Sequence, residues 1–176
     1  MTAQEHFESL YSEHAGAVLA YARRRVPDGQ AEDVTAEVFL TAWRRLDEIP
    51  TNTTVWLLGV ARRVLANQRR SQARQLALRA RMAHEPRGSE QPHVNATSDG
   101  RVTRALESLS EKDREVLLLV GWEELGHSDA ARVLEIRAGT FAVRLHRARK
   151  RFEQALQKDY RTARPPTQPS QPTEAR

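Results

Sequence analysis

Five side chains suited to contacts with nucleic acid recur along one stretch of this sequence: Trp56, Arg63, Asn67, Arg70 and Arg74. Their spacing of seven, four, three and four residues places them on one stripe of a helix. An aromatic ring stacks on an unpaired base, guanidinium groups neutralise phosphates, and an amide reads a base edge. We interpret the stripe as a surface for single-stranded or melted DNA, in preference to a solvated Arg face on which Trp56 closes the core.

The distribution of charge supports this interpretation. Residues 62–81 hold seven Arg and no acidic residue, whereas a merely solvated helix carries mixed pairs. Residues 1–60 carry nine acidic and five basic side chains, and residues 132–151 carry seven basic side chains and one acidic one. The sequence pI near 10.2 is typical of a nucleic-acid binder.

The second basic block has the proportions of a helix-turn-helix. A short helix is expected over Ser128–Leu134 and a longer one from Gly139, with four connecting residues between them. In the longer helix an apolar seam must face the core: Phe141, Leu145, Ala148 and Phe152. The solvent side then carries Ala142, Val143, His146, Arg147 and Lys150, with Arg144 and Arg149 at the margins where phosphates lie.

Paired carboxylates also occur, at Asp33 and Glu37, one helical turn apart. Such a pair can do acid–base chemistry, but no His, Lys or nucleophile lies nearby in sequence to complete a site. A solvated or protein-docking face is therefore favoured. The six His show no metal-ligand spacing, and no glycine-rich phosphate loop is present. We predict no enzymatic activity, no metal and no cofactor.

The sequence contains no Cys, which excludes a disulfide scaffold, a thiolate nucleophile and a zinc–thiolate site. The first residues lack the basic start and apolar stretch of a secretory signal. No run approaches the ~18 apolar residues of a membrane span. We expect a soluble cytoplasmic protein without membrane contact.

Hydrophobic periodicity predicts an all-α fold of two small helical domains joined by a flexible linker. In the first domain, one helix is expected to end at Pro27 and a second to span about 30–46. A third is expected to be capped by Thr53 or Thr54 and to continue to about 82. In the second domain, helices are expected over 102–109, 111–123, 128–134 and 139–156. Ser110 and Ser128 are predicted caps. The buried side of the second helix is predicted to hold Val34, Val38, Phe39, Ala42, Trp43 and Leu46.

The predicted organisation has four parts. Residues 1–83 and 101–160 form the two domains. The polar, turn-rich residues 84–100 link them. The Pro-rich tail 161–176 is expected to be disordered.

Three segments resemble a known family, the bacterial RNA polymerase sigma factors of the extracytoplasmic-function group. AEDVTAEVFLTAWRRLDEI resembles the family's core-binding helix, and VWLLGVARRVLANQRR resembles its minus-ten-element helix. LSEKDREVLLL followed by IRAGTFAVRLHRARKRF resembles its minus-thirty-five module. The resemblance covers nearly the whole chain outside the linker and tail, with the motifs in the family's order.

The resemblance implies a specificity subunit without covalent chemistry. Its partners would be core RNA polymerase, through the clamp helices of the largest subunit and the flap, and promoter DNA, both duplex and melted. Sigma factors of this group are commonly held by an anti-sigma factor. The implied core-binding residues are Asp33, Glu37 and Phe39.

The resemblance also implies two sets of DNA contacts. The minus-ten set combines the loop 51–54, which catches a flipped base, with the stripe: Thr51, Asn52, Thr53, Trp56, Arg63, Asn67, Arg70 and Arg74. The minus-thirty-five set is Arg137, Thr140, Ala142, Val143, Arg144, His146, Arg147 and Arg149.

The sequence departs from the family pattern at several of these positions. Ala36 stands where the family often has Gln, and Arg63 where it often has Asn. Ala142 and Val143 replace basic and hydroxyl residues on the DNA face. Apolar side chains contact thymine methyl groups but cannot donate to guanine, which shifts base reading to His146 and Arg147.

Two other classes of function compete with this interpretation. A helix-turn-helix regulator would bind duplex DNA without polymerase, as a dimer, and would leave Trp56 and the first Arg block unexplained. A nucleic-acid enzyme would need a carboxylate cluster for metal ions, and its only candidates, Asp33 and Glu37, lie far from the basic stripes in sequence.

Overall fold

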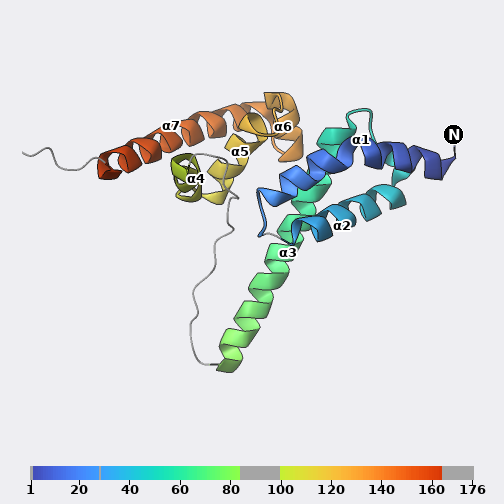
Figure 1. Cartoon of the computed structure of the whole chain (residues 1–176), viewed down its shortest axis with the longest axis horizontal. Coiled ribbons are helices and arrows are strands. Elements are labelled where there is room, and N and C mark those ends of the chain that lie inside the picture. Colours follow the sequence, from blue (N-terminus) through green and yellow to red (C-terminus); the bar gives the residue numbers. More distant parts are fainter. Residues whose placement is uncertain (1, 28, 84–99, 164–176) are drawn as a thin grey trace, which may run out of the picture.

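A computed structural model describes residues 2–27, 29–83 and 100–163, and every regular element within them is helical (Figure 1). The first unit contains α1 (Ala3–Arg23), α2 (Ala31–Arg44), the short 3-10 helix η1 (Leu46–Glu48) and α3 (Thr53–Ala83). The second contains α4 (Gly100–Glu107), α5 (Glu111–Gly121), α6 (His127–Val133) and α7 (Ala138–Ala163). The predicted all-α architecture with two helical units is confirmed.

Helix α1 starts and stops at clear local signals. The Thr2 hydroxyl accepts a hydrogen bond from the Glu5 amide at 3.2 Å, and the Glu5 carboxylate accepts one from the Thr2 amide at 2.7 Å. This capping box satisfies two amides that a helix start leaves unpaired. After α1 the chain turns through Pro27 and Gly29, which has a φ of 89° that glycine adopts at little cost.

Helix α3 has one part in the core and one part that extends away from it. Its first part packs against α1, α2 and α6, whereas its later turns run away from the other helices (Figure 1). Apolar residues at helical spacing form its buried side: Leu57, Val60, Ala61 and Val64.

The capping prediction for α3 is wrong. The helix begins at Thr53, so neither Thr53 nor Thr54 precedes it. The Asn52 carbonyl accepts from the Trp56 amide at 3.2 Å, and the Thr53 hydroxyl donates backwards to the Pro50 carbonyl at 3.2 Å.

The second unit is a helical cluster built around α5 and α7. Ser110 caps α5 as predicted, since its hydroxyl accepts from the Asp113 amide at 3.2 Å. The predicted cap at Ser128 is wrong, because α6 begins at His127 after Gly126. Phe141 is fully buried, and Leu145 and Ala148 lie beside it in the core, as the apolar seam of α7 predicted. Phe152, the fourth member of the predicted seam, is only half-buried.

Helix α7 continues to Ala163 and so includes residues 161–163, which were expected in the disordered tail. Gly100, expected in the linker, starts α4. The remaining predictions for the linker and tail concern residues 84–99 and 164–176, which lie outside the described residues.

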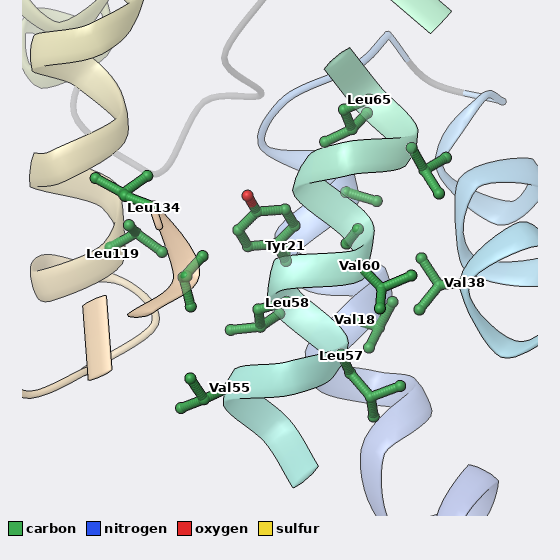
Figure 2. Packing of buried hydrophobic residues seen from close by; sticks show 14 of the residues in the cluster. Val18, Tyr21, Val38, Val55, Leu57, Leu58, Val60, Leu65, Leu119 and Leu134 are labelled. Atoms are coloured by element: carbon green, nitrogen blue, oxygen red, sulfur yellow. The ribbon is translucent and has the colours of Figure 1, made fainter. Parts of the chain in front are cut away.

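One buried apolar cluster runs through both units instead of ending at their boundary. Figure 2 shows Val55 and Leu58 of α3 facing Leu119 of α5 and Leu134 after α6, with Tyr21 of α1 beside them. The sequence predicted two domains joined by a linker and did not anticipate this contact.

Two aromatic residues of α2 lie differently than predicted or implied. Trp43, predicted on the buried side, is 45% exposed, although its ring packs edge-on against Phe7 at 5.1 Å between centroids. Phe39 is only 3% exposed and packs against Tyr11 at 4.7 Å. The burial of Phe39 agrees with the periodicity and leaves little of its ring accessible from outside, so its implied contact with polymerase stays a prediction.

Candidate nucleic-acid interface

The stripe on α3 is exposed along most of its length. Arg63, Asn67, Arg70 and Arg74 are exposed, and Trp56 is half-buried against the core. The Arg70 guanidinium donates to the Asn67 side-chain carbonyl at 2.7 Å. This bond orients the amide and leaves its NH₂ group available to donate to a base edge.

The loop before α3 is tied to helices on two sides. The hydroxyl of Thr54, in the first turn of α3, lies 3.2 Å from Nδ1 of His14, which anchors the end of the loop to α1. Asn52 donates from its side-chain amide to the Asp129 carboxylate of α6 at 3.2 Å. Thr51 is exposed and Thr53 half-buried. The loop implied to catch a flipped base therefore contacts the second unit.

Arg63 also reaches the second unit. Its Nη1 lies 3.5 Å from the carboxylate of Glu135, while its Nε donates to the Gly59 carbonyl at 3.3 Å. Both partners of the ion pair are about half exposed, so the pair contributes little to stability by itself. The pair holds the Arg63 side chain against the turn between α6 and α7.

Arg69 lies off the stripe, and no sequence pattern assigned it a role. It is half-buried, forms an ion pair with Glu111 of α5, and donates to the Arg25 carbonyl at 3.5 Å. Burial lowers the pKa of Arg69, an effect that the nearby Glu115 carboxylate opposes. The seven Arg of residues 62–81 gave no signal that one of them, Arg69, faces inward.

The helix-turn-helix presents an open face. Helix α6 leads through residues 134–137 into α7, and Glu135 in this turn has a φ of 56°, an uncommon value for a residue other than glycine. Arg144 is half-buried at the margin of that face. The exposed members of the predicted minus-thirty-five set are Arg137, Thr140, Ala142, Val143, His146, Arg147 and Arg149.

The acidic face of α2 is solvent-accessible. Asp33 and Glu37 are exposed, and Glu37 accepts a long hydrogen bond of 3.5 Å from Gln68 of α3. Leu40, which belongs to none of the predicted site sets, follows on the same side and is 49% exposed. The sequence could have indicated this exposed position, because Leu40 is an apolar residue that lies outside the buried side of the helix.

Nothing in the described residues suggests a metal centre or a membrane segment. Across residues 2–27, 29–83 and 100–163, no group of three or more His, Asp or Glu is placed to hold a metal ion. In the same residues, no helix is long and apolar enough to cross a membrane.

Comparison with known proteins identifies both units. Residues 10–75 match the family description "Sigma-70 region 2", and residues 99–152 match "Sigma-70, region 4". The ECF RNA polymerase sigma factor SigC of Mycobacterium tuberculosis is 34% identical over 126 residues, which is 69% of this chain and 67% of SigC. The chain belongs to the ECF sigma factors.

Further sigma factors resemble the chain over more of its length. The RNA polymerase sigma-E factor of Streptomyces avermitilis is 30% identical over 159 residues, 86% of this chain and 85% of that protein. The solved structure of CnrH in complex with the cytosolic domain of CnrY has a TM-score of 0.62 at 26% identity, covering 89% of this chain and 90% of that one. This ECF sigma factor therefore shares both sequence and fold with its relatives.

Proposed function

We propose that this ECF sigma factor binds core RNA polymerase through α2, reads duplex promoter DNA through α7 and holds the melted strand on α3. The observation that carries the proposal is the presence of two basic surfaces on one chain. A helix-turn-helix regulator of duplex DNA accounts for α7 but not for the exposed stripe on α3.

Strand capture needs no catalysis by the sigma factor itself. Extruding a base costs a few kcal/mol, which stacking on an aromatic ring and contacts to phosphates offset. Trp56 supplies the partly exposed ring, Asn67 the amide, and Arg63, Arg70 and Arg74 the positive charge. RNA synthesis then belongs to the polymerase, and the protein acts in the cytoplasm, where that enzyme works.

Docking on polymerase is assigned to the exposed carboxylates Asp33 and Glu37, with Leu40 as an apolar contact beside them. Phe39 supports this face from within the core. An anti-sigma factor is a further proposed partner, supported by the complex in which the related CnrH was solved.

A binding assay with and without polymerase tests this function against a regulator that acts alone. A labelled pool of genomic duplex fragments is titrated with the chain, with bacterial core RNA polymerase, and with both together. Selective retention of a subset of fragments by the combination alone is expected. Tight, selective binding by the chain alone, with no gain from polymerase, would instead support the regulator.

The recognition helix makes a prediction that separates positioning from reading. Alanine at Arg149, on the margin, should weaken duplex binding to all promoters alike and reduce the salt-dependence slope by about one. Alanine at Arg147 should cost about 1–3 kcal/mol at one preferred base and relax selection there. Transcription of a promoter library by each variant at several salt concentrations measures both effects. Uniform loss with the Arg147 variant would make Arg147 a phosphate contact.

A further inference from the structure

The exposed face of the recognition helix α7 has an apolar centre. Val143 is 52% exposed, and on a helix of about 3.6 residues per turn it lies almost directly opposite the buried Phe141 and Leu145. Ala142 beside it and Gly139 one turn earlier are also exposed. The middle of this face therefore carries three residues whose side chains neither donate nor accept a hydrogen bond.

Gly139 keeps the space beside Val143 open. A Cβ at Gly139 would meet no atom within 4 Å, so no neighbour in the described residues requires the side chain to be missing. Its φ is not among the positive values of the chain, so the backbone does not require glycine either. With no side chain at this position, a flat molecular surface can approach the helix closely in front of Val143.

Basic side chains surround the apolar centre. Arg147 follows Val143 by one turn, and Arg144 and Arg149 lie at the margins of the face. From Ala138 to Lys150 the helix has no acidic residue. Flanking cations of this kind bind phosphates, whereas the middle of a recognition helix faces base edges in the major groove. The arrangement therefore places Val143 against a base.

The chemistry of the base edges selects the partner of Val143. In the major groove guanine, adenine and cytosine present hydrogen-bond donors or acceptors, and a Val side chain leaves these groups unpaired. Thymine also presents a methyl group, and contact between this methyl group and Val143 removes apolar surface from water. Residues 138–150 contain no carboxylate that could accept from the amino group of cytosine. Thymine is therefore the base that fits this surface.

We propose that Val143 is a specificity-determining residue, which selects a thymine of the duplex promoter through the C5-methyl group of that base. The proposal rests on the function proposed above and names the base feature that the first two turns of α7 read. Arg147 and Arg149 have other roles, because they bind through charge and hydrogen bonds. Selection at the position facing Val143 depends on a methyl group alone.

Deoxyuridine tests this claim, because it pairs with adenine as thymidine does and lacks only the methyl group. One tightly bound duplex is first selected from randomised DNA by the original chain together with bacterial core RNA polymerase. Copies of that duplex are then made in which one thymine at a time is replaced by uracil. Anisotropy of each labelled duplex, titrated with the chain and core polymerase, gives its dissociation constant.

Two variants are compared with the original chain. V143A shortens an exposed side chain, so the fold should be unaffected. The matched control is L76A, which shortens another apolar side chain, 55% exposed on α3 and off the stripe. Circular dichroism and titration with core polymerase in the absence of DNA check that both variants are folded and bind the enzyme normally.

For the original chain and for L76A, uracil at one position or at two adjacent positions should weaken binding about fourfold. This factor corresponds to the ~0.8 kcal/mol of one buried methylene group. V143A should lose no affinity when uracil replaces thymine at the same position. A C·G pair placed there gives a second readout. The original chain should bind 5-methylcytosine about fourfold more tightly than cytosine, and V143A should bind both equally.

Three outcomes would overturn the proposal. Selective duplex binding that is indifferent to uracil at every position would show that no methyl group is read, and would leave the proposed function intact. Undiminished sensitivity to uracil in folded V143A would assign the methyl contact to another side chain. Failure of the original chain and core polymerase to select any duplex would contradict the proposed function itself, and this inference with it.

Discussion

Alanine at Asn67 is expected to lower open-complex formation by about tenfold or more while leaving polymerase recruitment unchanged. The Asn67 amide is exposed, oriented by Arg70 and able to reach a base edge only after the duplex has melted. A good amide contact to a base contributes about 1–3 kcal/mol. Permanganate reactivity of promoter thymines measures opening, and the amount of polymerase bound to duplex promoter measures recruitment.

A second variant and a control complete this experiment. Trp56→Ala should reduce opening by a similar or larger factor, since stacking of a base contributes about 1–3 kcal/mol. Because Trp56 also packs against the core, its variant is compared only after its folding has been checked. Gln72→Ala, exposed on the same helix but off the stripe, should behave like the original protein. Normal opening with failed recruitment would show that α3 does not capture the strand.

Lysine at Glu37 is expected to weaken binding to core RNA polymerase by at least about tenfold, or about 1.4 kcal/mol. Glu37 is exposed and its bond to Gln68 is long, so the free energy of unfolding should change by less than about 0.5 kcal/mol. Reversal of a charge at a complementary interface replaces attraction with repulsion. Titration of labelled protein with core polymerase gives the dissociation constant, and thermal unfolding gives the stability.

The matched control for this charge reversal is Asp47→Lys. Asp47 is exposed on η1, outside the acidic face of α2, and the substitution changes net charge by the same amount. Its affinity for polymerase should stay close to that of the original chain. Equal affinity of the Glu37 and Asp47 variants would remove α2 from the proposed docking surface.

Local sequence signals predicted most of the helices because those signals act over a few residues. The apolar seam of α7 and the cap at Ser110 depend on neighbours within one or two turns. The cap is confirmed, and so is the burial of three of the four seam residues. The errors at Thr53 and Ser128 are shifts of one or two positions at helix starts. Several polar residues compete for the cap there, and their order along the chain does not decide between them.

Such local signals could not predict the contact between the two units. Tyr21 and Glu115 are separated by 94 positions, and Arg25 and Glu123 by 98. Arg25 is one of three consecutive Arg, and periodicity gives no reason for that member to be buried. Pairing at this distance depends on how two folded surfaces meet, which is a property of the tertiary structure.

In the candidate site, too, the sequence predicted the features that depend on helical spacing but not those that depend on tertiary packing. The exposed stripe on α3 and the open face of α7 follow from helical spacing, as predicted. The resemblance placed Phe39 at the polymerase contact, but its ring is needed in the core beside Tyr11, and Leu40 is the neighbouring apolar residue at the surface. Family motifs identify a segment, whereas burial decides which of its side chains a partner can touch.

Run-off transcription tests the central claim most directly. Purified chain and bacterial core RNA polymerase are incubated, separately and together, with linear genomic fragments and nucleotides. Discrete transcripts are expected only when both proteins are present, with start sites that share upstream sequences at two separate positions. No transcript above that of core polymerase alone would contradict the account, provided that the chain is folded and the same polymerase initiates with another sigma factor.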